Sequence, residues 1–155
     1  MPNNYDFYSW QETLAILPKK SPLTHPPDLF KTDYIYIDQI EQLPEIIPYL
    51  QASAIGIDCE TSGLDPLKDE IRLLQLAIPD YPVLIIDQIA LNEEKEYIQK
   101  IFTSSSLKIG HNLKFELQFL TRLGFKLSPP FFDTMLGYQV LIAGLKKNLV
   151  FLLSL

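Results

Sequence analysis

Two acidic residues close together at the end of a predicted strand are the first feature of this chain that suggests chemistry. Asp58 and Glu60 belong to the predicted strand Ala54–Glu60, whose first half is apolar. Because alternate side chains of a strand point to the same side of a sheet, we expect both carboxylates on one side and Cys59 on the other. Such a pair repels itself unless solvent, a cationic group or a metal ion neutralises it. It is therefore either a solvated strand end or part of a site for a hard cation such as Mg²⁺.

A third acid falls on the apolar side of a predicted helix. Glu116 lies within the helix that we expect from Asn112 to Leu123. The apolar residues around it at helical spacing are Leu113, Leu117 and Leu120. A carboxylate on that stripe is costly unless it is paired or bound to metal, and Lys114 and Arg122 fall on other sides of the helix. Glu116 is expected either at the edge of the stripe, reaching water, or beside the first two acids.

The elements that must position these acids follow from periodicity and turn residues. Strands are predicted at Tyr34–Ile37, Ala54–Glu60, Ile71–Ile78, Val83–Ile86, Leu107–Gly110 and Phe131–Phe132. Helices are predicted from Asp38 to about Gln51, over 93–102 with Asn92 as cap, from Asn112 to Leu123 with Gly124 closing it, from Asp133 as cap to Ala143, and from near Asn148 onward. Consecutive strands favour antiparallel pairing, whereas the later strand–helix units need parallel crossovers. The order predicts an α/β fold, with a mixed β-sheet flanked by helices.

Composition indicates one globular domain with an extension. The chain has 155 residues, 47% of them hydrophobic, which is enough to bury a core without disulfides or a structural metal. Residues 1–32 contain five of the twelve prolines and little periodic pattern, so we predict a partly irregular N-terminal extension and a domain over 33–155. The single Cys59 cannot form an internal disulfide. With no signal peptide or membrane span visible, these features indicate a cytoplasmic protein.

The net charge of −6 is unevenly distributed along the chain. Residues 1–102 carry 7 Lys and Arg against 17 Asp and Glu, a balance of −10, whereas residues 103–155 carry 6 against 2, a balance of +4. Such asymmetry hints at a polyanionic partner. Solvated surface lysines and arginines would produce the same pattern.

Four blocks of sequence carry a resemblance to a known family. They are Ile57–Pro66, Arg72–Ala77, Ile109–Glu116 and Phe132–Leu136. In this order they resemble the 3′–5′ proofreading exonuclease domain of bacterial family A DNA polymerases, and ribonuclease D more distantly. The resemblance covers the chain from about Tyr34 to its end and implies a ribonuclease-H-like fold. It also implies removal of nucleotides from the 3′ end of single-stranded DNA or RNA.

The resemblance assigns roles to individual residues. It implies that Asp58, Glu60 and Glu116 are catalytic and hold two Mg²⁺ or Mn²⁺ ions about 4 Å apart, which activate water and stabilise the leaving 3′ oxygen. It places the residues that contact nucleic acid at Thr61, Leu64, His111, Asn112 and Lys114. Other roles stay open for part of this set: Asn112 is also a suitable helix cap, and His111 a solvated loop residue. Phe115 and Phe119 are expected in the core, and the pair Asp133-Thr134 as a helix cap.

The chain departs from the family pattern in two ways. Glu116 stands where the family usually has Asp, and the extra methylene moves the carboxylate by about 1.5 Å. Displacements near 1 Å can cost about 10²-fold in rate. The resemblance implies that this acid often acts through metal-bound water, which absorbs part of the change, so we expect weakened rather than abolished activity. The family's last motif, Tyr-x-x-x-Asp, does not occur downstream of Glu116. We therefore expect a domain that lacks its final helix and binds the second metal poorly.

Two other interpretations remain. The chain could be a catalytically inactive remnant that binds nucleic acid or docks on a partner such as a polymerase domain or the missing C-terminal segment. It could also be a truncated product that folds poorly.

Overall fold

A computed structural model describes residues 33–93, 95–142 and 148–153 of the chain. The extension predicted over 1–32 lies outside the described residues, so its boundary with the domain stays a prediction. The end of the helix predicted to reach Ala143 also lies outside them. No helix of the described residues is long and apolar enough to cross a membrane.

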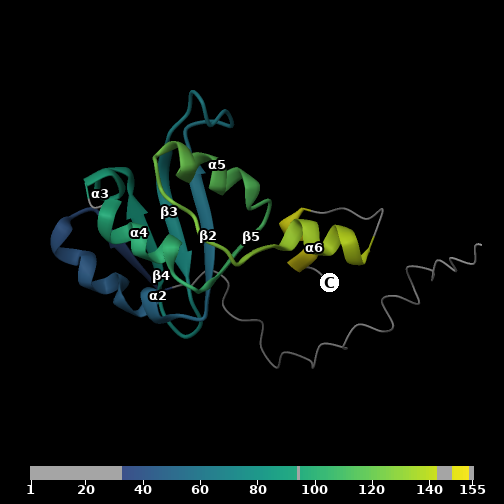
Figure 1. The fold of residues 1–155 in the computed structure, drawn as a ribbon, viewed down its shortest axis with the longest axis horizontal. Coiled ribbons are helices and arrows are strands. Elements are labelled where there is room, and N and C mark those ends of the chain that lie inside the picture. Colours follow the sequence, from purple (N-terminus) through teal and green to yellow (C-terminus); the bar gives the residue numbers. More distant parts are fainter. Residues whose placement is uncertain (1–32, 94, 143–147, 154–155) are drawn as a thin grey trace, which may run out of the picture. The chain divides into compact units, whose positions relative to one another are not determined.

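Strands rich in isoleucine and leucine build one sheet across the described residues (Figure 1). Its strands are β1 (Tyr34–Ile37), β2 (Ala54–Thr61), β3 (Ile71–Ala77), β4 (Val83–Asp87), β5 (Leu107–Gly110) and β6 (Phe131–Asp133). They lie in the order β1-β4-β3-β2-β5-β6. The consecutive strands β2, β3 and β4 pair antiparallel, whereas the pairs β1–β4, β2–β5 and β5–β6 are parallel. The predicted mixed α/β architecture is confirmed.

Seven helical segments accompany the sheet within the described residues. They are η1 (Ile40–Ile46, a 3-10 helix), α2 (Ile47–Gln51), α3 (Gln88–Glu93), α4 (Lys95–Thr103), α5 (Lys114–Arg122), α6 (Thr134–Leu141) and α7 (Leu149–Leu153). In Figure 1, α2, α3 and α4 gather on one side of the sheet. Phe125, just beyond the end of α5, packs against α4. Its ring contacts that of Phe102 edge to face, with 5.1 Å between the ring centroids. The core therefore lies between these helices and one face of the sheet.

The alternation of β2 follows its contact with this core. Ile55, Ile57 and Cys59 are buried, whereas Asp58 and Glu60 between and beyond them are exposed. The predicted placement of the two acids on one side of the strand and the thiol on the other is confirmed.

The helix starts predicted at Asp38 and Asn92 differ from the structure. The chain enters α3 directly after β4, with Asp87 Oδ1 accepting the Ile89 N–H at 2.9 Å, so Asn92 lies inside a helix and is not a cap. The first helix begins with Gln39 and Gln42 in a capping box rather than with Asp38. Both errors arise because another nearby side chain, Asp87 in one case and a glutamine in the other, makes the hydrogen bonds that we assigned to Asn92 and Asp38.

Candidate functional site

The first part of the site is the end of β2. Asp58 lies opposite Gln75 of β3 and Glu60 opposite Leu73, and the register shifts between Glu60 and Thr61. Gln75 Nε2 donates a hydrogen bond to Glu60 Oε1 at 3.4 Å. Burial raises the pKa of Asp58, the charge of Glu60 adds to this rise, and a hydrogen bond from the Cys59 backbone opposes it. The negative charge of Glu60 thus adds to the cost of ionising Asp58.

Glu116 of α5 supplies the second part. The residue is only 4% exposed, which confirms that this acid falls on the buried side of its helix. Its Oε2 atom is buried and makes no hydrogen bond within the described residues. Burial raises the pKa of Glu116 to about 7, and the charges of Asp58 and Asp133 contribute to the rise, against a hydrogen bond from its own backbone. A buried carboxylate with an unpaired oxygen is costly and calls for a functional explanation.

The sheet topology explains how Glu116 comes near the acids of β2. The pairing of β5 with β2 begins at Leu107 opposite Ala54 and ends at Ile109 opposite Gly56, so the acidic end of β2 continues past its last paired residue. The chain turns there into α5. Burial is the main cause that raises the pKa of the Cys59 thiol, and the charges of both Glu116 and Asp58 add to the rise. Residues distant in sequence therefore share one electrostatic environment.

The donor set suits a hard divalent cation in its chemistry. Carboxylate oxygens are the ligands that Mg²⁺ and Mn²⁺ prefer, and the unpaired Glu116 Oε2 is an acceptor without a donor. The only side-chain ion pair among the described residues joins Lys68 to Asp65 at 3.1 Å, so it neutralises none of the three acids. Within the described part of the chain, no group of three or more His, Cys, Asp or Glu side chains is close enough together to hold one metal ion. Asp58, Glu60 and Glu116 thus offer the charge and the oxygens, while water or substrate would have to complete the coordination.

The turn between β5 and α5 differs from the prediction at Asn112. This residue has a φ of 61°, in the left-handed region, and its backbone N–H donates to Asp133 Oδ1 at 3.0 Å. The residue at the N-cap position is Leu113, without a side-chain hydrogen bond. Asn112 is therefore not the cap; Asn tolerates the left-handed conformation better than most residues, which suits it to this turn. Its predicted contact with nucleic acid stays a prediction.

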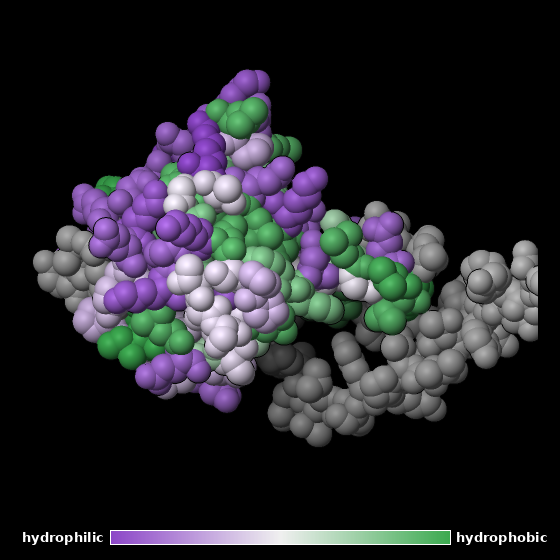
Figure 2. All heavy atoms as spheres, in the orientation of Figure 1, coloured by the Kyte–Doolittle hydropathy of each residue, from purple (hydrophilic) through white to green (hydrophobic). Residues whose placement is uncertain are grey.

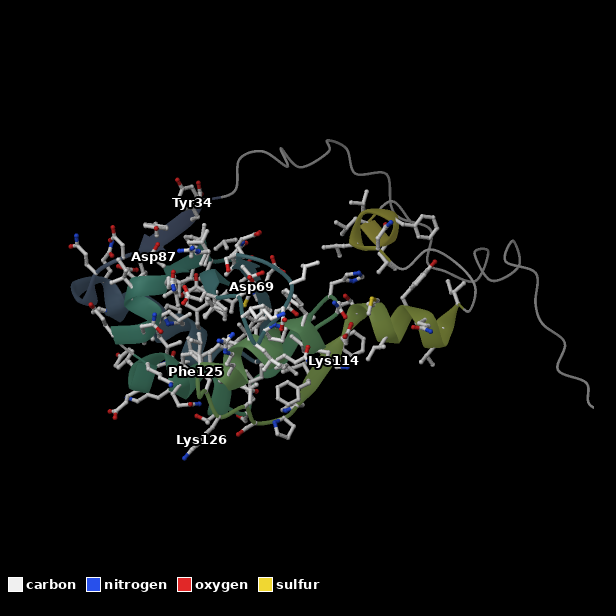
Figure 3. All side chains as sticks on the ribbon, turned by 90° about the horizontal axis from the view of Figure 1, so that it is seen from above. Tyr34, Asp69, Asp87, Lys114, Phe125 and Lys126 are labelled. Carbon is white, nitrogen blue, oxygen red and sulfur yellow. The ribbon has the colours of Figure 1, made fainter. Side chains whose placement is uncertain are left out.

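His111 and Lys114 flank that turn. His111 Nδ1 lies 3.0 Å from Thr134 Oγ1, and Thr134 Oγ1 in turn donates to Gly110 O at 3.1 Å. These two contacts link the His111 ring through Thr134 to the main chain of β5. Lys114 is exposed at the start of α5 (Figure 3).

Asp133 has a larger part than its predicted role as a cap. Its Oδ1 accepts the N–H groups of Met135 at 2.9 Å and Leu136 at 3.3 Å, which confirms the cap of α6. The same oxygen holds the Asn112 turn, and its charge reaches Glu116. The sequence analysis missed this second role, which depends on the parallel pairing of β6 with β5. That pairing sets Asp133 opposite Gly110.

The aromatic residues of α5 belong to the core, as predicted. Phe119 is 2% exposed, and its ring centroid lies 4.9 Å from that of the half-buried Phe115. Thr61 and Leu64 lie beyond the acids, where Thr61 Oγ1 donates to Gly63 O at 2.6 Å and Leu64 is 83% exposed.

An apolar groove of about 1330 Å³ lies beside this site, between the outer side of α5, the loop after β2, and α6. Its lining includes Leu67, Leu117, Phe132, Val140, Lys114 and Asp133. Figure 2 shows hydrophobic surface on α6, where Val140 is 85% exposed. None of the three acids lines the groove, so the groove and the carboxylates are separate features.

Comparison with known proteins places the chain among nucleases. Residues 34–154 match the 3′-5′ exonuclease family of the DNA polymerase A type. DNA polymerase I of Borreliella burgdorferi is 32% identical over 119 residues, which cover 72% of this chain and 13% of that protein. The chain spans less than a fifth of the DNA polymerase I proteins it matches.

Solved structures share the fold at lower identity. Brucella melitensis NrnC with bound Mg²⁺ is 22% identical with a TM-score of 0.63, over 79% of this chain and 58% of that one. Escherichia coli RNase D, an exoribonuclease involved in structured RNA processing, is 19% identical with a TM-score of 0.57, over 66% and 28%. The sequence match and the mixed sheet of this chain indicate the same family. The chain belongs to the 3′-5′ exonuclease family of the DNA polymerase A type, with a ribonuclease-H-like fold.

Proposed function

We propose that this chain removes nucleotides from the 3′ ends of single-stranded nucleic acid by metal-dependent hydrolysis, at the site of Asp58, Glu60 and Glu116. The observation that carries the proposal is the buried Glu116 carboxylate, whose Oε2 lacks a partner and whose pKa rises partly through the charge of Asp58. A fold seldom retains such a group for stability alone, because burial of an unpaired carboxylate is unfavourable.

The three carboxylates would hold two divalent cations, Mg²⁺ or Mn²⁺, which supply activation of a water molecule and stabilisation of the leaving 3′ oxygen. In this proposal Asp58 and Glu60 at the end of β2 would help to hold these ions. Gln75 orients Glu60 through its side-chain hydrogen bond. The NrnC structure with bound Mg²⁺, which shares this fold, supports the choice of metal.

The substrate would be a flexible single strand. Thr61 and Leu64, just beyond the acids, would contact the terminal nucleotide, and Asn112, Lys114 and His111 would lie along the strand. Exposed Lys114 suits a phosphate group electrostatically, and a ring N–H of His111 can donate to a phosphate oxygen. The match to DNA polymerase I favours DNA, a role in replication or repair, and a polymerase domain as a partner. A cytoplasmic location is part of the same proposal.

A nuclease assay tests the proposal. The purified chain is incubated with a 5′-labelled single-stranded oligonucleotide and Mg²⁺ or Mn²⁺, and we expect a ladder of products shortened from the 3′ end. The variants D58N and E60Q should lose it. D80N is the matched control, because it also removes one exposed negative charge, at the far end of β3, and its φ of 62° suits asparagine.

The variant E116D separates a weakened nuclease from an inactive binding protein. Restoring the shorter acid should speed shortening of the oligonucleotide if Glu116 attenuates the reaction. If neither the chain nor E116D cuts the strand, while binding remains sensitive to salt, the chain is a nucleic-acid-binding remnant instead. A ladder that persists in D58N would show that the activity arises elsewhere.

A further inference from the structure

The loop between β2 and β3, residues 62–70, has a defined backbone held by its own hydrogen bonds. Asp65 O accepts the Asp69 N–H at 2.8 Å, and Asp69 Oδ2 accepts the Asp65 N–H at 2.8 Å. At the base of the loop, Ser62 N–H donates to Glu70 O at 2.9 Å. In Figure 1 the loop projects from the end of β2 and β3.

This ordered loop presents apolar side chains to solvent. Leu64 is 83% exposed and Leu67 is 78% exposed. An exposed leucine costs little by itself, but a leucine fixed on an ordered loop directly after Glu60 is well placed to pack against the base of a bound nucleotide. Such packing requires the loop to keep its position relative to α5, which carries Glu116.

One side chain joins the loop to that helix. Arg122, the last residue of α5, donates from its single Nη1 atom to Asp69 O at 3.0 Å and also to Pro66 O. The two carbonyls belong to one turn of the loop, more than fifty residues earlier in the sequence. Nη1 has two protons, so this one group satisfies both acceptors.

We propose that Arg122 is a positioning residue, which fixes the loop carrying Leu64 against the helix carrying Glu116 so that the terminal nucleotide meets the carboxylates. The inference rests on the proposed function. It is independent of any direct contact between Arg122 and nucleic acid. Lysine at this position keeps the charge but is shorter and lacks the planar guanidinium, so it should restore the bridge only in part.

The test combines loop dynamics with substrate binding in the full chain. Hydrogen–deuterium exchange reports on residues 62–70, and fluorescence anisotropy reports binding of a 5′-labelled single strand in Ca²⁺. We expect R122A to speed exchange in the loop and to weaken binding about tenfold, as the loss of charged hydrogen bonds implies. R122K should fall between R122A and the wild type.

K126A is the matched control. Lys126 carries the same charge just beyond α5, and its hydrogen bonds with Gln99 run through its main chain, so they survive the substitution. Figure 3 places Lys126 at the edge of the molecule, away from Asp69. K126A should bind within about twofold of the wild type, because one exposed charge contributes little.

The outcomes separate the inference from the proposed function. If the wild type binds and R122A binds equally well, the inference is wrong while the proposed function stands, even if exchange in the loop has accelerated. If K126A weakens binding as much as R122A, the charge rather than the bridge matters, and the inference is again wrong. If the wild type does not bind, both fail. Thermal melts confirm that each variant is folded.

Discussion

Replacing Glu116 by glutamine should stabilise the metal-free protein at neutral and alkaline pH. The carboxyl has an ordinary pKa of 4.5 in the unfolded chain and about 7 in the folded chain, chiefly because of burial. Between these values the unfolded state has released a proton that the folded state retains. The free energy of unfolding therefore falls as pH rises through this window, and the loss is complete above about pH 7.

The magnitude follows from the two pKa values. At ~1.4 kcal/mol per pH unit, moving the pKa from 4.5 to about 7 corresponds to about 3 kcal/mol of destabilisation by the charged carboxylate. Glutamine removes the charge but keeps a polar group at a place where Oε2 has no partner, so about 3 kcal/mol is an upper bound for E116Q.

The assay is urea unfolding of the wild type and E116Q at several pH values from 4 to 8 in the presence of a chelator. The difference between the two proteins isolates this carboxyl from the other groups that titrate. We expect the difference in unfolding free energy to grow in favour of E116Q as pH rises. A difference that stays constant across this range would refute the reasoning, because it would show that Glu116 has the same pKa in both states.

Two further predictions concern buried groups outside the proposed site. K108M should lower the free energy of unfolding, measured by urea denaturation, by about 2 kcal/mol. Lys108 is fully buried, and its Nζ donates to Ser128 O at 3.0 Å and to Ser104 O, so the variant leaves both carbonyls without this donor. Unchanged stability would contradict this account. Cys59 should resist iodoacetamide at pH 8 in the folded protein and react after unfolding, since burial and the nearby carboxylates raise its pKa. Mass spectrometry measures the rate of modification. If Cys59 in the folded chain reacts as fast as a free thiol, the burial of Cys59 is contradicted.

The strands were predictable because their signals are local. Tyr34–Ile37 and Leu107–Gly110 have the predicted bounds, and the breaker between Ile71–Ala77 and Val83–Asp87 gives the expected antiparallel pair. Helical spacing also put Glu116 close to the apolar stripe, but it left open whether the carboxylate reaches water, and the structure shows it buried.

The turns and long-range contacts were not predictable in the same way. Asn112 reads locally as a cap, but its backbone conformation accompanies a bond to Asp133, twenty-one residues later. The bridge from Arg122 to the loop likewise joins positions whose proximity only the β2–β3 hairpin and the packing of α5 create. Single-residue preferences contain no information about such partners.

The structure also changes what the basic charge of the C-terminal part means. Of its lysines and arginines, Lys108 is buried and holds two carbonyls, and Arg122 bridges α5 to the loop, so both have structural partners. Lys114 and Lys126 are the exposed lysines of this part within the described residues. A phosphate approaching the acids of β2 therefore meets mainly negative charge, and in the proposed function divalent cations would be needed to admit the substrate as well as to cut it.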